Sequence, residues 1–120
     1  YAALRAERDE VTRRYADLFA THRLDALVFP TVPVTAPAVG ATTVRVDGRE
    51  RDLLLTTIAN GTAAPSAGLP AVTVPAGTAA DGLPVGLEFD GPAGTDRGLL
   101  GLARLAERVL GPGRPTAPDR

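Results

Sequence analysis

The sequence predicts an α/β protein in which helices cover a small sheet. Two segments, near residues 1–23 and 95–110, carry apolar residues at helical spacing. Three short segments between them, near 25–29, 71–75 and 85–90, are rich in β-branched residues and are bounded by proline, glycine or aspartate. The order helix, strand, loop, strand, strand, helix is typical of an arrangement in layers.

The first helix, near residues 1–23, has an amphipathic pattern. Opposite charges stand four residues apart on its polar side, as Glu10 and Arg14 do, and each such pair stabilises a helix by about 0.2–0.5 kcal/mol. We expect the last turn to hold His22, where a cation suits the helix dipole. The apolar stripe consists of Leu4, Val11, Tyr15 and Leu18, widened by Phe19.

A short buried strand is expected next, in the stretch LDALVFP from Leu24 to Pro30. Proline removes a backbone donor and fixes φ, so the run of Pro30, Pro33 and Pro37 predicts an extended loop after this strand.

Residues 43–68 predict further local elements. Alternating valines before Asp47-Gly48 indicate a small hairpin. Asp52 is a good helix cap and Asn60-Gly61 a good stop, which favours a short helix between them. The β-branched residues at 56–58 leave a strand as the alternative. The small residues that follow Asn60 predict a loop.

The last third of the chain predicts two strands and a helix. Gly86 inside the second strand indicates that a neighbouring group approaches its backbone closely. The final helix is expected to begin at Thr95 and to end before Gly111-Pro112. We expect residues 1–110 to belong to one domain and residues 111–120 to form a flexible tail.

Charge and composition exclude several classes of protein. The net charge of −1 creates no field that would attract nucleic acid or an anionic membrane. No run reaches the roughly 18 apolar residues that a membrane span needs. Cysteine is absent, which removes disulfides and thiolate metal sites. We therefore expect no nucleic-acid partner, no membrane partner, no metal and no cofactor, and a cytoplasmic location.

No set of catalytic side chains is apparent. Ser66 and His22 are the only serine and the only histidine, and we interpret them as a turn hydroxyl and a helix-end cation. Glu88 and Asp90 stand two apart on one predicted strand and so face the same way. Such a pair suits acid–base chemistry, but we interpret it as the solvated face of a strand.

Several stretches in combination resemble the C-terminal region of the amidase signature family. These are LDALVFPTVPVTAP, then AGLPAVTVPAG, then GLPVGLEFDG, and a final helix DRGLLGLARLAERVL. Their order and spacing match the family from about Leu24 to Leu110. Asn60, ten residues before Pro70, and the helix entry Gly94-Thr95-Asp96-Arg97 are similar to the branch of indoleacetamide and mandelamide hydrolases.

The resemblance implies hydrolysis of a carboxylic amide, such as an arylacetamide, to an acid and ammonia. The family uses a serine nucleophile, a second serine held by a cis peptide bond, and a lysine that takes the proton. This chain has no lysine, and its one serine lies outside a Gly/Ser-rich run. We therefore expect no catalytic residue in this chain and no hydrolysis by it alone. The chain also lacks methionine, from which we expect Tyr1 to lie inside a longer protein or at a processed end. The resemblance implies that residues 1–110 are the C-terminal part of an amidase domain whose catalytic part is missing from this sequence.

The resemblance also implies where this region would touch a substrate. In the family, the C-terminal strands complete the central mixed sheet, and loops at strand ends line the pocket for the acyl group. The corresponding loops here contain Thr31, Val32 and Pro33 after the first strand, and Asn60 before the second. We expect these four residues to bind substrate, with turn-shaping alone as the alternative role.

Other identities stay open. The chain could be a small accessory module that docks on a catalytic partner, or a non-catalytic structural domain. A third relative is the A subunit of the tRNA-dependent amidotransferase. That subunit usually carries Tyr-x-x-Asp-x-x-Thr-x-x-x-Asn where this chain has LLLTTIANGTAAPS, and this difference argues against it. The expected partner is a small-molecule amide bound by the complete enzyme, and homo-oligomer formation is left open.

Overall fold

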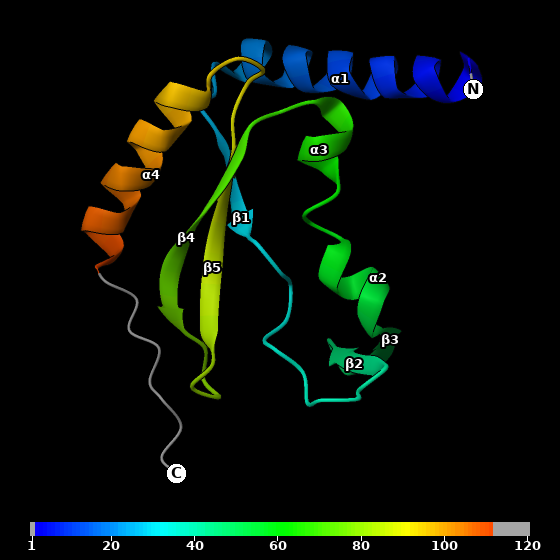
Figure 1. The fold of residues 1–120 in the computed structure, drawn as a ribbon, viewed down its shortest axis with the longest axis vertical. Helices are drawn as coiled ribbons and strands as arrows, with labels where there is room; N and C mark the ends of the chain where they lie inside the picture. Colours follow the sequence, from blue (N-terminus) through cyan, green and yellow to red (C-terminus); the bar gives the residue numbers. More distant parts are fainter. Residues whose placement is uncertain (1, 112–120) are drawn as a thin grey trace.

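A computed structural model of the chain describes residues 2–111. The expected tail, residues 111–120, lies outside the described residues except for Gly111. The fold is mixed α/β, as the sequence predicts (Figure 1). Its elements are α1 (Ala2–His22), β1 (Leu27–Pro30), β2 (Thr43–Val46), β3 (Arg49–Asp52), α2 (Leu53–Ile58), α3 (Ala63–Ala67), β4 (Ala71–Thr78), β5 (Pro84–Asp90) and α4 (Asp96–Leu110).

The main sheet has the strand order β1-β5-β4, and its neighbours are antiparallel. Phe89 in the central strand β5 pairs with Val28 on one side and with Val72 on the other. β1, the first strand in sequence, forms one edge of this sheet, and β4 forms the other. The register against β4 shifts between Pro75 and Thr78, near the β4–β5 turn.

A separate hairpin joins β2 and β3, with Val44 opposite Arg51. Its turn residues, Asp47 and Gly48, both have positive φ, at 50° and 76°. That backbone is the one that a two-residue hairpin turn of the favoured twist requires. The short helix α2 follows directly, and the Asp52 carboxylate accepts a hydrogen bond from the Leu55 amide at 2.9 Å. Both local predictions are thus confirmed.

The hydrophobic core lies between α4 and the sheet. It consists of Val74, Phe89, Leu99 and Ala103, all less than a tenth exposed. α4 runs alongside β4 and β5 (Figure 1). Asp96 stands in its first turn, where a negative charge suits the helix dipole.

α1 runs across the end of the sheet and projects beyond it (Figure 1). Of its predicted apolar stripe, only Phe19 is buried, whereas Leu4 is 68% exposed. Two hydrogen bonds tie α1 to α3, from Arg8 Nε to the Ser66 carbonyl at 3.0 Å and from the Thr12 hydroxyl to the Ala67 carbonyl at 3.2 Å. The radius of gyration is 16.6 Å, against about 14 Å for a compact domain of this length.

Two expectations about local structure are wrong. β1 is not a buried strand: its residues alternate between half-buried and exposed, and Val28 is 51% exposed, because it lies at a sheet edge that α4 does not cover. The residues after Asn60 are not all loop, because Ala63–Ala67 form the short helix α3. Pro65 is compatible with that helix since the first-turn amides have no intrahelical acceptor.

Candidate functional site

A cavity of about 420 Å³ lies between the loop after β1 and the β4–β5 hairpin. That volume falls within the range of about 300–1,000 Å³ that is typical of small-molecule sites. Most of its wall is apolar, with four threonines among the lining residues. The lining consists of Thr31, Val32, Val34, Thr35, Ala36, Pro37, Thr57, Thr73, Pro84, Val85 and Gly86.

Two of those threonines meet over a glycine. The hydroxyls of Thr31, just after β1, and Thr73, on β4, lie 3.1 Å apart within hydrogen-bonding distance. Between them on β5 stands Gly86. A Cβ added to Gly86 would lie 2.8 Å from Thr73 Cγ2 and 2.9 Å from Thr31 Oγ1. The close approach predicted at Gly86 is present, and the absence of a side chain there lets the two hydroxyls touch.

The loop that forms one wall of this cavity is fixed at several points. The Thr31 amide donates to the Gly86 carbonyl at 3.0 Å. The side-chain amide of Asn60 donates to the Pro30 carbonyl at 2.7 Å. Further along, the Thr35 hydroxyl donates to Asp81 Oδ2 at 2.6 Å. This bond, followed by one from the Leu83 amide, lowers the pKa of the Asp81 carboxyl.

The four residues expected to bind substrate therefore occupy different positions. Thr31 and Val32 line the cavity. Pro33 is exposed and lies outside the lining formed by the described residues. Asn60 holds the backbone just before Thr31 through its bond to Pro30. Contact of any of them with a substrate stays a prediction.

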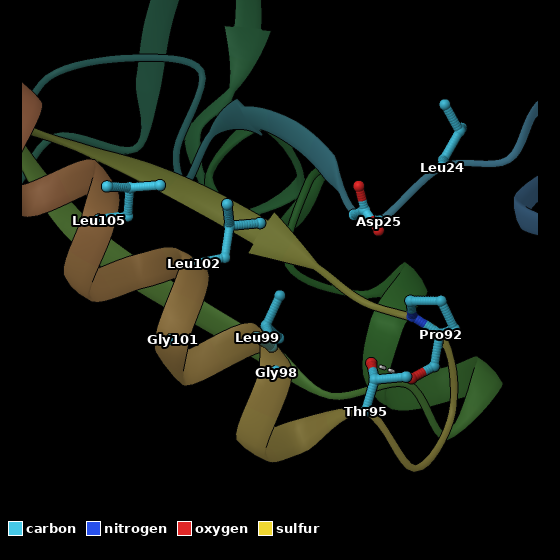
Figure 2. Close-up of a pocket in the computed structure, with 9 residues that line it drawn as sticks. All are labelled: Leu24, Asp25, Pro92, Thr95, Gly98, Leu99, Gly101, Leu102 and Leu105. Carbon is cyan, nitrogen blue, oxygen red and sulfur yellow. Dashed lines mark hydrogen bonds between the residues drawn. The ribbon is translucent and has the colours of Figure 1, made fainter.

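A second cavity, of about 470 Å³, lies between α4 and the segment that precedes β1. Figure 2 shows Leu99, Leu102 and Leu105 on one side of α4, with Leu24 and Asp25 on the segment that precedes β1. The hydroxyl of Thr95 in its wall already donates to the Pro92 carbonyl at 2.7 Å (Figure 2). Leucine side chains and the bare backbone of Gly98 and Gly101 form most of its lining, so we interpret this hollow as a packing surface.

The carboxyls of Glu88 and Asp90 are not on a solvated strand face, so that interpretation is wrong. Glu88 is 6% exposed and Asp90 is 1% exposed. By alternation along β5 they point away from the α4 side, to which Phe89 belongs. Burial, and then the negative charge of Glu88, raise the pKa of Asp90 to about 6. Asp90 Oδ1 has no hydrogen-bond partner among the described residues.

Ser66 and His22 do not form a nucleophile–base pair. Ser66 lies beside Arg8 of α1, and its hydroxyl donates to the Thr62 carbonyl at 2.6 Å. His22 is fourteen residues further along α1 than Arg8, which corresponds to about 21 Å of helix. Within residues 2–111, no group of three or more His, Asp or Glu side chains is placed to hold a metal ion.

Sequence reasoning missed Thr73 and Thr57 as cavity residues. Thr73 sits on the exposed face of β4, and Thr57 on the short helix α2. A signal for Thr73 existed, because a glycine inside a strand indicates that neighbouring groups approach it. It did not identify which residue would do so.

None of the helices in the described part of the chain is long and apolar enough to cross a membrane.

Comparison with known proteins points to one family. A profile of the amidase family matches residues 1–100. An indoleacetamide hydrolase of Allorhizobium ampelinum is 35% identical over 109 residues, 90% of this chain and 24% of that protein. A mandelamide hydrolase of Pseudomonas putida is 34% identical over 112 residues, 92% of this chain and 21% of that protein.

The fold agrees with these relatives. The crystal structure of an amidase superimposes with a TM-score of 0.78 at 29% identity, over 88% of this chain and 24% of that chain. The chain thus spans between a fifth and a quarter of the length of the proteins that it resembles.

Proposed function

The chain belongs to the amidase family, and we propose that it forms the C-terminal part of an enzyme that hydrolyses a carboxylic amide to an acid and ammonia. Similarity over nine-tenths of this chain to indoleacetamide and mandelamide hydrolases supports this proposal. The relatives' names also suggest the substrate class, which is a small amide with an aromatic acyl group.

In this proposal the chain supplies scaffold and pocket rather than the groups that break the bond. It contains no lysine and one serine, and that serine is engaged within α3. A serine nucleophile and its base would come from the rest of the enzyme. Thr31 and Val32 would contact the acyl group, while Asn60 would position the loop that carries them.

The cavity between the loop after β1 and the β4–β5 hairpin is the observation that carries the proposal. It is concave, mostly apolar and about 420 Å³ in volume, which suits the aromatic part of an arylacetamide. Its wall is held by backbone and side-chain hydrogen bonds at Thr31, Pro30 and Thr35. A fixed wall is expected of a site that must orient a small substrate.

The test begins with ammonia release from indoleacetamide, mandelamide and phenylacetamide. We expect the complete enzyme that contains this chain to release ammonia and the isolated chain to release none. Release by the purified chain alone would contradict the assignment of the catalytic groups to the rest of the enzyme.

The pocket is tested by filling it. Val32→Phe in the complete enzyme should raise KM for an arylacetamide by about ten-fold, since an added ring takes the space of the acyl group. Val39→Phe is the matched control, because Val39 follows in the same connection and is fully exposed. If both variants keep the kinetics of the parent for all three amides, the cavity is not the acyl pocket.

A further inference from the structure

The cavity holds one polar feature, a pair of threonine hydroxyls, whose hydrogen-bonding capacity the described residues use only in part. Of the four threonine hydroxyls in the lining, Thr35 donates to Asp81 Oδ2 at 2.6 Å and Thr57 donates to the Leu54 carbonyl at 2.9 Å. Thr31 and Thr73 bond to each other at 3.1 Å. The hydroxyl protons of Thr35 and Thr57 are therefore both engaged, whereas the other two hydroxyls share a single hydrogen bond.

This pair has defined hydrogen-bonding capacity left for a ligand. Each hydroxyl has one proton and two lone pairs. When one of the two donates to the other, one proton and three lone pairs remain. Within this chain Thr73 is exposed and Thr31 is half-buried, so the chain itself leaves both hydroxyls open to a molecule in the cavity.

The position of the pair is set by the sheet. Thr73 lies within β4, Thr31 directly follows β1, and both strands pair with β5. Gly86 of β5 leaves the space that the two side chains fill, and the Thr31 amide bonds to its carbonyl. Because threonine is stiff at χ1, the two hydroxyls are held in place before a ligand arrives.

The surroundings favour a neutral ligand that both donates and accepts. Thr73 is opposite Glu88 in the β4–β5 register, which brings their Cβ atoms to about 5 Å, and the Glu88 carboxylate disfavours an anionic group nearby. A ligand hydroxyl can accept a hydrogen bond from the remaining threonine proton and can donate one to a remaining threonine lone pair. A ligand carbonyl oxygen can only accept the hydrogen bond.

From this geometry, and resting on the proposed function of the cavity, we propose that the Thr31–Thr73 pair selects amides whose acyl group carries a hydroxyl. The pair is a specificity determinant and takes no part in breaking the amide bond. A neutral hydrogen bond of this kind changes kcat/KM by about 3- to 10-fold.

Mandelamide and phenylacetamide test the proposal, because they differ by one hydroxyl on the carbon next to the carbonyl. 4-Hydroxyphenylacetamide places the hydroxyl on the ring instead. In the complete enzyme, at least one hydroxylated amide should have a higher kcat/KM than phenylacetamide. The ratio to follow is kcat/KM for the hydroxylated amide divided by kcat/KM for phenylacetamide. Thr73→Val, which keeps the side-chain shape, should reduce that ratio by about 3- to 10-fold. Whichever of the two hydroxylated amides shows this reduction identifies the position of the substrate hydroxyl that the pair binds.

Three further variants make the result decisive. Thr31→Val should reduce the ratio as Thr73→Val does, and Thr73→Ser should restore it because the hydroxyl is kept. Thr78→Val, on the same strand but outside the cavity lining formed by the described residues, should leave the ratio unchanged. A ratio that both valine variants leave at the parental value overturns the proposal.

Other outcomes separate this proposal from the function beneath it. If the valine variants lower kcat/KM equally for all amides and also lower Tm, the pair is a structural cross-strand contact and the specificity proposal is wrong. If the complete enzyme releases no ammonia from any amide, the proposed function fails, and the specificity proposal fails with it. Hydrolysis with an unresponsive ratio removes the specificity proposal alone.

Discussion

The two faces of β5 differ in how their side chains are used. Toward α4, Phe89 is packed with Val74, Leu99 and Ala103 in an apolar core. On the other face, alternate residues have a polar side chain or none. Gly86 lets two threonine hydroxyls meet, and Glu88 and Asp90 carry buried carboxyls. Apolar burial stabilises the first face, whereas the second places polar groups where burial costs free energy. The second face is therefore where a function is expected.

The largest expected effect lies on the apolar face. Leu99→Ala in the isolated chain should lower the opening free energy of α4, β4 and β5 by about 2–5 kcal/mol, because it leaves a cavity in the core. Hydrogen exchange of the backbone amides measures this effect region by region. Leu100→Ala is the matched control, since Leu100 is the next residue and is 57% exposed; it should cost less than about 1 kcal/mol. Equal costs would mean that α4 packs through a different face.

A smaller effect is expected on the polar face, at Gly86. Gly86→Ala should cost about 1–3 kcal/mol, because the added Cβ would lie within 3.0 Å of both threonine side chains. Displacing them should also reduce the preference for a hydroxylated amide. Gly98→Ala on α4 is the opposite case: its Cβ would meet nothing within 4 Å, and alanine is favoured in a helix by up to about 1 kcal/mol. Thermal melting of both variants compares the two sites.

The most specific effect concerns the pH dependence of stability. Folding raises the pKa of Asp90 from 3.8 to about 6, so between these values the folded state holds a proton that the unfolded state has lost. The contribution of Asp90 to the free energy of unfolding is therefore most favourable at low pH and declines as pH rises from about 4 through 6. Asp90→Asn should remove this decline. Its Tm should exceed that of the parent at pH 7 by more than at pH 4.

Asp81→Asn serves as the control of opposite sign. Hydrogen bonds from Thr35 and the Leu83 amide lower the pKa of Asp81, so its contribution is present above the unfolded pKa and is lost as pH falls. The asparagine variant should lose stability at pH 7 and little at low pH. A parental pH profile for Asp90→Asn would show that the Asp90 carboxyl does not titrate differently on folding.

Local patterns in the sequence predict most of the elements. Alternation before Asp47-Gly48 gives the hairpin, and the carboxylate of Asp52 caps α2 as expected. The pairing of Glu10 with Arg14 on α1 is also present. Each depends on contacts within a few residues of chain, so the residue types alone are enough to predict it.

The predictions from sequence are wrong where the burial of a side chain depends on segments far away in the chain. β1 has the composition of a buried strand, but α4 lies over β4 and β5 and leaves Val28 half exposed. Glu88 and Asp90 have the composition of a solvated face, yet the surrounding chain covers them. Period-two alternation shows which residues share a face and does not show what covers that face.

By itself the sequence determined the kinds of elements, their order and the resemblance to amidases, because these follow from short-range periodicity and from residue motifs. Only the tertiary structure brought Thr31 and Thr73 together, 42 residues apart, and placed two carboxyls out of solvent. The physical reason is strand order: β5 lies between β1 and β4. Which residues meet across Gly86 is therefore set by the register in which β1 pairs with the β4–β5 hairpin, from which it is far apart in the chain.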